Sequence, residues 1–336
     1  MTDSATAVAD PAAADPAPQA QGPVSALEGR NWGDLAFRGV LTTGALAVPV
    51  LMGFLVWELW VGSRLAVDQF GFDFVTASVW DPVAGQFGAV PLIFGTLVSS
   101  FLALCIAVPL SLGVAIFLTE FAPTRIRQPI AFVVELLAAI PSVVYGLWGI
   151  FVLIPFLRAT IFPFLRGLFG FLPFFQGPIY GPSMLSAAVI LAIMVMPYIM
   201  SVSREVLLAV PPSQREAALA LGATRWEAVI SAVVPYARSG IIGAVILGLG
   251  RALGETMAVT MVIGNRHEIA ASLFAPGYTM AAVIANEFTE AATDIHFSAL
   301  TLVALVLFVV TVLVNAGARI LIWRVARGRP EGGRGL

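Results

Sequence analysis

The sequence predicts an all-α integral membrane protein with six transmembrane helices. Hydrophobic residues make up 59% of its 336 residues, charged residues only 11%, and the mean hydropathy is +0.93. A soluble domain carries about 25% charged residues, so this chain has too few charges to cover a surface that faces water. The composition therefore excludes an ordinary soluble enzyme, a nucleic-acid-binding protein and a disordered protein, and it leaves a protein embedded in a bilayer.

Six apolar stretches are long enough to cross a membrane, since about 20 helical residues span roughly 30 Å of hydrocarbon. Pro109 and Pro197 predict kinks in the second and the fourth stretch. The segment 160–175 is apolar but short, and Pro163 and Pro173 interrupt it, which favours an interfacial or re-entrant piece over a seventh span. We place the six spans near residues 37–60, 89–118, 130–157, 183–203, 240–264 and 298–323.

The ends of the chain and the arginines predict its orientation. Residues 1–35, rich in Ala and Pro, are expected to form a disordered cytoplasmic tail, and residues 326–336 a basic cytoplasmic tail. Residues 36–325 form the transmembrane domain. With both tails inside, 13 of the 18 arginines lie on the inner side, one lies within a span, and four lie on the outer side: Arg64, Arg158, Arg166 and Arg266. This excess predicts an N-in, C-in topology.

All 18 basic residues are arginine, and the chain contains no lysine. A P-loop needs a lysine to reach the nucleotide phosphates, so the chain cannot carry such an ATP site. The single Cys105 cannot form an intrachain disulfide. His267 and His296 lack a third ligand at metal-binding spacing, so we expect solvated loop histidines and no metal. We therefore expect no cofactor in this chain.

The longest inner connection is the segment 205–239. Ser213 and Glu216 fit an S-x-x-E capping box at a helix start, and Gly222 fits the left-handed residue that ends a helix. A second helix is expected to begin at Thr224. On local physics alone two interpretations are open: a solvated linker with an ordinary capping signal, or a helix-turn-helix that docks a partner.

The letters of this loop resemble the EAA loop of ABC-importer permeases. Glu-Ala-Ala at 216–218 is followed after three residues by a glycine, and then by Ala-Val-Val-Pro at 232–235, where the family has Ile-x-Leu-Pro. In that family the loop inserts into a groove on a cytosolic ATPase. The resemblance implies that a separate chain supplies the P-loop lysine, and that the residues coupling the two are Ser213, Glu216, Ala217, Ala218, Gly222 and Pro235.

One arginine lies inside the fifth apolar stretch. If that span begins near Gly240, Arg251 lies about 16 Å along it, near the midplane, where a charge facing lipid costs at least about 2.5–3.5 kcal/mol. Glu255 follows one helical turn later, so the two can pair, and glycines 248, 250 and 254 leave room beside them. Either the pair only fixes helix packing, or the arginine coordinates an anion with its planar fork beside a pathway.

Three further motifs resemble the PstC-type permease family of phosphate-specific ABC importers. They are LGRALGETMAVTMVIGN at 249–265, ELLAAIPSVVYG at 135–146 and ANEF at 285–288, and the similarity covers most of residues 37–325. The resemblance implies the MetI-like fold of type I ABC importer permeases. It also implies that the two charged residues of the first motif, Arg251 and Glu255, take part in phosphate passage.

Four other residues of these motifs are candidates for supporting roles. Ser142 and Tyr145 are candidates for lining the substrate pathway, and a purely structural role is the alternative. Asn286 and Glu287 lie in an apolar outer segment and are candidates for an outer gate or for contact with a binding protein.

The resemblance implies an inner-membrane subunit that forms half of the pathway of an ATP-driven phosphate importer and catalyses no covalent chemistry. The implied partners are a PstA-like permease subunit as heterodimer, two PstB-like ATPase subunits, an extracytoplasmic PstS-like phosphate-binding protein and membrane lipid, without nucleic acid. Two alternatives stay open: a permease for another oxyanion, such as molybdate or sulfate, and an ion-coupled secondary transporter. An inverted repeat would favour the latter, and the sequence shows no convincing one.

Overall fold

A computed structural model of the chain describes residues 32–327. The two predicted tails, residues 1–35 and 326–336, fall almost entirely outside this range and stay predictions. The chain divides into two compact units, Met1–Phe54 and Leu55–Leu336. In the first unit the described residues belong to helix α1 (Trp32–Gly62), which contains the first candidate span, Leu35–Gly62.

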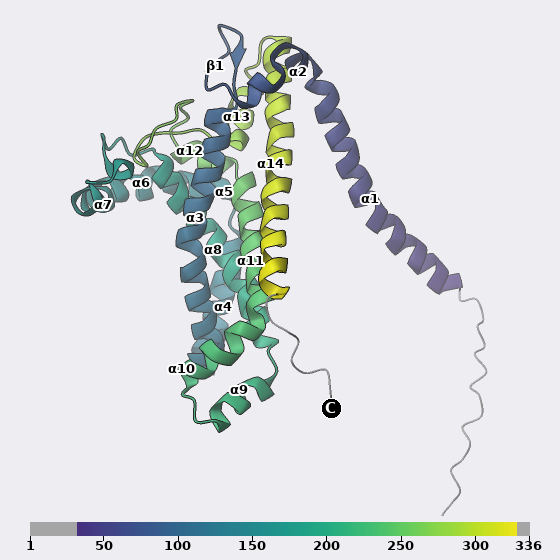
Figure 1. Cartoon of the computed structure of the whole chain (residues 1–336), viewed down its shortest axis with the longest axis vertical. Helices are drawn as coiled ribbons and strands as arrows, with labels where there is room; N and C mark the ends of the chain where they lie inside the picture. The colour runs from purple at the N-terminus through teal and green to yellow at the C-terminus, as the bar shows by residue number, and fades with distance from the viewer. Residues whose placement is uncertain (1–31, 328–336) are drawn as a thin grey trace, which may run out of the picture. The chain divides into compact units, whose positions relative to one another are not determined.

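The second unit is a bundle of long helices that run side by side (Figure 1). Helix α8 (Met184–Leu208) is its centre: two thirds of its most apolar window is buried, against about a third or less in its neighbours. It packs most extensively against α3 and α11. Because α8 is surrounded by protein, the main apolar core lies along it. The neighbouring long helices are α3 (Val90–Ile116), α11 (Val234–Gly254) and α14 (Asp294–Arg327).

Six helical runs of the described residues are long and apolar enough to cross a membrane, as the sequence predicts. Helices α3 and α8 continue through Pro109 and Pro197 without ending. The six runs are Leu35–Gly62, Val90–Phe121, Ser142–Phe169, Met184–Leu208, Arg225–Gly254 and Asp294–Ile320.

The bounds predicted for the third span are wrong. Helix α4 (Thr124–Ala139) ends inside the predicted stretch 130–157, and the spanning run starts afresh at Ser142. Pro141 has no N–H and disfavours helix in the residue before it, and Ile140 is accordingly extended, with ψ of 130°. The run continues through π-helical turns and takes in the first part of the segment 160–175. It comprises α5 (Ser142–Trp148), α6 (Ile154–Phe156) and α7 (Phe162–Phe169).

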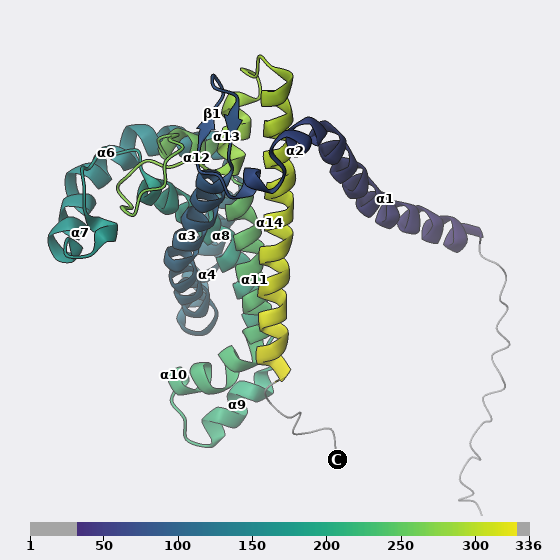
Figure 2. The ribbon, with the colours of Figure 1, turned by 45° about the horizontal axis from the view of Figure 1, so that its top comes forward.

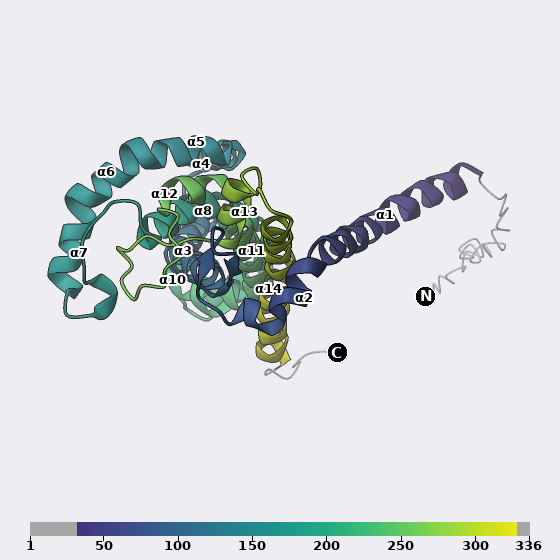
Figure 3. The ribbon, with the colours of Figure 1, turned by 90° about the horizontal axis from the view of Figure 1, so that it is seen from above.

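The third run does not lie parallel to the other long helices of this unit. Figure 3 shows α5, α6 and α7 along a curve that follows one side of the bundle, and in Figure 2 α6 and α7 lead away from α3 and α8. Residues 149–153 and 157–161 are π-helical, and such wide turns bend a helix. A short 3₁₀ turn, Pro173–Phe175, then ends the segment.

The fifth span also differs from its predicted bounds, 240–264. It begins earlier, at α10 (Arg225–Ala228), and passes through a π-helical turn into α11, which ends at Gly254. Glu255 is extended, with ψ of 127°, and a separate short helix, α12 (Met257–Val262), follows. Two of the predicted spans are therefore interrupted helices.

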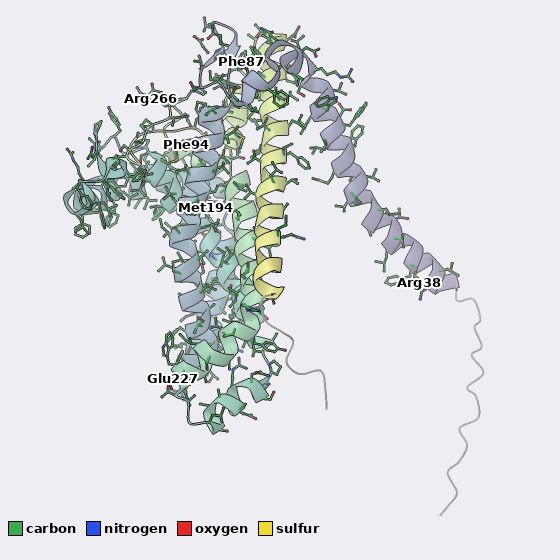
Figure 4. All side chains as sticks on the ribbon, in the orientation of Figure 1. Arg38, Phe87, Phe94, Met194, Glu227 and Arg266 are labelled. Carbon is green, nitrogen blue, oxygen red and sulfur yellow. The ribbon has the colours of Figure 1, made fainter. Side chains whose placement is uncertain are left out.

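The second unit has two opposite ends, marked in Figure 4 by Glu227 at one and by Phe87 and Arg266 at the other. The loop end, residues 209–233, contains α9 (Pro212–Ala220) and α10. The hairpin end, residues 63–88 and 264–296, contains a short antiparallel hairpin in which Trp80 pairs with Phe87. Its elements are α2 (Arg64–Phe70), the 3₁₀ turn Gly71–Val75, β1 (Trp80–Asp81), β2 (Gln86–Phe87) and α13 (Met280–Glu287).

Candidate functional site

The two interrupted helices come together within the bundle. Helix α12, after the second break, packs against α5, after the first break, and also against α8. Gly146 makes this approach possible, because a Cβ there would meet the Met261 sulfur and would lie 3.2 Å from Ala258 Cα. Non-helical backbone at membrane depth is tolerated only inside protein or along a water-filled cavity. In transporters, interrupted helices of this kind form substrate sites.

Two tyrosine hydroxyls donate to backbone carbonyl groups at the first break. In an unbroken helix the Leu137 carbonyl would accept from residue 141, which is a proline without an N–H. It accepts instead from the Tyr145 hydroxyl at 2.9 Å and, over a longer 3.4 Å, from the N–H of Ile140. The Tyr198 hydroxyl, from α8, donates to the carbonyl of Ala138 at 3.1 Å. The break is therefore a supported feature of the fold, and Tyr145 has a structural role there.

Arg251 lies in the last turn of α11, before the second break. Its guanidinium carbon is 4.2 Å from the centroid of the Tyr198 ring, a cation–π contact. Its buried Nε has no hydrogen-bond partner among the described residues. Tyr198 thus connects the two breaks: its hydroxyl binds α4 and its ring face receives Arg251. An arginine that keeps unused donors in an apolar span is poised to bind an anion.

The predicted pair between Arg251 and Glu255 does not form in the described part of the chain. The prediction assumed that the helix continues for another turn, whereas α11 ends at Gly254 and Glu255 is extended. Positions i and i+4 share a face only in a continuous helix. Glu255 is instead a half-buried residue at the second break. Ser142, at the first break, is half-buried as well.

Of the three glycines beside Arg251, only Gly248 is in a tight contact. A Cβ at Gly248 would lie 2.7 Å from the Ile199 side chain of α8, whereas Gly254 faces open space. Tyr198 is the site residue that the sequence did not single out. Its signal was present, however: a tyrosine directly after Pro197 in an otherwise apolar span must find a partner for its hydroxyl.

The segment at the loop end folds as two helices around a glycine turn, as predicted. Gly222 has φ of +87°, a conformation that costs other residues energy, and its N–H donates to Leu219 O at 2.9 Å. The capping box, however, is at Thr224 and Glu227, which satisfy each other's backbone N–H groups. The box predicted at Ser213 and Glu216 is wrong, because α9 starts at Pro212 without a side-chain cap.

The predicted coupling residues mostly face outward. Ser213, Glu216 and Ala217 are exposed on α9, Ala218 is half-buried, and Pro235 lies in the first turn of α11. Large apolar side chains around the glycine turn are exposed as well: Leu219, Leu221 and Trp226. Exposed apolar side chains that border a turn are typical of a protein–protein contact. Which of these residues a partner touches stays a prediction.

Glu287 is the centre of a polar cluster at the hairpin end, and its side chain is only 15% exposed. Its Oε2 accepts a hydrogen bond from Trp80 Nε1 at 2.9 Å and lies 3.2 Å from His296 Nε2. His267 Nε2 lies 3.2 Å from the other carboxylate oxygen, Oε1, a contact that is an ion pair when the imidazole is protonated. The ring of Trp80 stacks on His267, and that of Phe87 on His296.

The expectation of solvated histidines is therefore wrong, because His296 is buried and His267 half-buried around one carboxylate. Burial raises the pKa of Glu287, but the contacts with His267, Trp80 and His296 outweigh it and hold that pKa below its ordinary value. Burial raises the pKa of Tyr278 to about 12, and its hydroxyl accepts from Asn286 Nδ2 at 2.9 Å. Asn286 and Glu287 thus hold the hairpin end together, whatever else they contact.

Comparison with known proteins assigns the class. Residues 107–327 match the family described as "Binding-protein-dependent transport system inner membrane component". The solved structures with the same fold include a bacterial ABC transporter involved in alginate import (TM-score 0.59, 19% identity, 88% of this chain and 99% of that one). They also include the MetNI methionine ABC transporter in an inward-facing conformation (TM-score 0.53, 17% identity, 74% and 99%).

Closer relatives carry a more particular name. A "Phosphate transport system permease protein PstC" from Mesorhizobium japonicum is 49% identical over 87% of this chain and 90% of its own length. One from Haemophilus influenzae is 44% identical over 88% and 95%. The chain therefore belongs to the inner-membrane components of binding-protein-dependent transport systems and, within them, to the PstC-type permeases. These are multi-pass membrane subunits of ABC importers and not enzymes, and they work with ATPase and substrate-binding components.

Proposed function

We propose that this chain forms half of the translocation pathway of an ATP-driven phosphate importer. The observation that carries the proposal is the guanidinium of Arg251, which lies at the second break, against the Tyr198 ring, without a carboxylate partner in the described part of the chain. A phosphate offers two oxygens that the planar fork of an arginine can bind at the same time. The names of the relatives, all phosphate permeases, support this anion over molybdate or sulfate.

The proposed partners are those that membership in the PstC-type permeases implies. Two PstB-like ATPase subunits bind the ATP, in keeping with the absence of a P-loop lysine from this chain, and this chain carries no cofactor. A PstA-like permease supplies the other half of the pathway, and a PstS-like protein delivers phosphate from outside the cell. With the loop end in the cytoplasm, as the arginine distribution predicts, the exposed turn at 219–226 meets the ATPase.

During transport, the substrate site near the midplane of the bilayer opens alternately to the two sides of the membrane. The ATPase moves α9 and α10, the helices that follow rock, and the site at Arg251 opens to one side and then to the other. The two breaks, at Pro141 and at Glu255, give short helices α5 and α12 that can shift without bending a continuous span. Every proton and bond of the phosphate stays in place during passage.

Substitution of the arginine tests the pathway. Arg251→Gln should leave the protein at normal abundance in the membrane and abolish ATP-dependent phosphate uptake into proteoliposomes, because the neutral amide cannot replace the charged fork. Arg266→Gln, at the hairpin end and 59% exposed, is the matched control and should retain uptake. Normal uptake by Arg251→Gln would exclude the pathway role.

The same proteoliposomes distinguish the alternatives. Excess molybdate or sulfate should not compete with labelled phosphate, whereas strong competition would favour a permease for another oxyanion. Uptake that needs an ion gradient and continues without ATP would favour a secondary transporter.

The loop end is tested by capture of the ATPase. Glu216→Arg and Gly222→Trp should abolish co-purification of the ATPase subunit, since the first reverses a charge on α9 and the second strains a residue with φ of +87°. Glu268→Arg, at the opposite end, should leave capture unchanged. Retention of the ATPase by both loop variants would contradict docking at this turn.

A further inference from the structure

The helix that carries the coupling residues is held to the bundle by one arginine. Arg215 of α9 grips the carboxylate of Glu120 with both sides of its fork: Nη2 lies 2.7 Å from Oε1, and Nε lies 3.1 and 3.2 Å from the two oxygens. Glu120 lies in the π-helical turn that ends α3. Ninety-five positions of sequence separate the two residues, so this is a tertiary contact between two elements.

The same guanidinium also binds the end of α8. Its Nη2 donates to Leu207 O at 3.0 Å and its Nη1 to Val210 O at 2.8 Å. Carbonyl groups at the end of a helix have no partner within that helix, and their partial negative charge favours a cation. One side chain therefore connects α9 to α3 and α8, the two helices with the most extensive mutual packing in the unit.

Besides this side chain, α9 packs against α10 and the π-helical turn 229–233, but not against the buried core. The helix has no buried residue of its own. A cavity of about 160 Å³ lies beside it, lined by side chains of α9 and of the segment after it, together with Glu120. The Arg215–Glu120 pair itself is well enclosed, with side chains 25% and 12% exposed. Because α9 buries no side chain of its own, the contacts of Arg215 are the direct connection through which a displacement of α9 reaches α3 and α8.

We propose that Arg215 and Glu120 are positioning residues that transmit the movement of α9 to α3 and α8, so that ATP hydrolysis is coupled to the opening of the pathway. This inference rests on the proposed function, in which an ATPase docks at the loop end. It assigns to the pair a role distinct from docking, since Glu120 lies on α3 and not in the loop. This role suits an arginine, because its planar guanidinium binds a carboxylate through two hydrogen bonds at once, whereas the ammonium group of a lysine does not.

The test compares hydrolysis with transport in the assembled complex. In Glu120→Gln, Arg215 keeps its two carbonyl partners but loses the carboxylate. Proteoliposomes containing the variant complex should still hydrolyse ATP, while the phosphate transported per ATP falls about tenfold, equivalent to about 1.4 kcal/mol. Arg215→Lys, which keeps the charge and loses the fork, should lower the same ratio. If the Glu120→Gln protein does not reach normal abundance in the membrane, the Arg215→Lys variant serves as the test.

A matched control removes a carboxylate from another ion pair. Glu268→Gln breaks the exposed contact with Arg266, 3.8 Å long and at the hairpin end, and should keep the wild-type ratio. A ratio that stays at the wild-type value in Glu120→Gln would overturn the proposal. So would an equal loss of hydrolysis and uptake, because a docking or folding defect lowers both together. Failure of the proposed function is a separate result, since the wild-type complex itself would then import no phosphate.

Discussion

The two ends of the second unit are each held by one buried carboxylate, but the donors differ. At the loop end Glu120 is bound by the guanidinium of Arg215. At the hairpin end Glu287 is bound by the indole of Trp80 and approached by two imidazoles. A guanidinium brings a positive charge and a planar fork of donors to its carboxylate, whereas an indole brings one neutral N–H. The loop end thus has a bidentate ionic clamp, and the hairpin end a network centred on a carboxylate whose pKa its contacts lower.

The difference fits the expected surroundings of the two ends. The loop end would transmit force from a partner, and a bidentate pair holds one geometry. The hairpin end packs aromatic rings around its carboxylate, so that Trp80, Phe87 and His296 form an enclosed corner. Part of that corner borders an open hollow of about 380 Å³, with Glu290 and Thr293 on its wall.

The largest expected effect is at the loop end. Arg215→Ala leaves Glu120 buried without its cation, and removes the side-chain donor of Val210 O and one of the donors of Leu207 O. We expect a loss of about 3 kcal/mol in the free energy of unfolding, as when one partner of a buried pair is removed. Thermal unfolding of the detergent-solubilised protein measures it, and a midpoint like that of the wild type would show that the clamp is not stabilising.

The second effect concerns pH and the hairpin end. The contacts of Glu287 hold its pKa below the ordinary 4.5, so its ionised form stabilises the fold above that pH, and the stabilisation is lost as pH falls through the lowered pKa. Glu287→Gln should cost about 2 kcal/mol at pH 7. The difference from the wild type should shrink as pH falls through that lowered pKa. A difference that does not vary with pH would contradict the ionic role of Glu287.

A smaller effect separates the donors of that carboxylate. Trp80→Phe keeps an aromatic ring beside Phe87 but removes the N–H that binds Glu287. The loss should be about 1 kcal/mol, as for one hydrogen bond, and chemical denaturation at pH 7 can measure it. The effect should shrink in a Glu287→Gln background, and strict additivity of the two substitutions would indicate that they do not interact.

The smallest effect lies within the loop end itself. Thr224→Ala removes the cap of α10 and should cost about 1 kcal/mol. Ser213→Ala, at the position where the sequence alone predicts a box, should change stability by less than about 0.5 kcal/mol, because that side chain caps nothing in the structure. Parallel thermal scans compare the two alanines, and a larger loss for Ser213→Ala would reverse the assignment.

Apolar length and composition were sufficient to predict the membrane class, the six spans and the turn at Gly222. They were sufficient because a bilayer imposes one requirement on every span, and because a positive φ favours one residue type. Prediction failed where a helix stops inside an apolar stretch. At Glu255 nothing in the local letters marks the end of α11, and the predicted ion pair with Arg251 was lost with that turn.

The sequence alone determined that this chain lies in a membrane, that Arg251 lies within a span, and that the chain has no lysine for a P-loop. Only the tertiary structure decided which groups those residues meet. It placed Tyr198 beneath Arg251, joined Arg215 to Glu120, and gathered two histidines around Glu287. The physical reason is that hydropathy and helix signals depend on neighbours along the chain, whereas a buried charge is satisfied by whichever distant element packs against it.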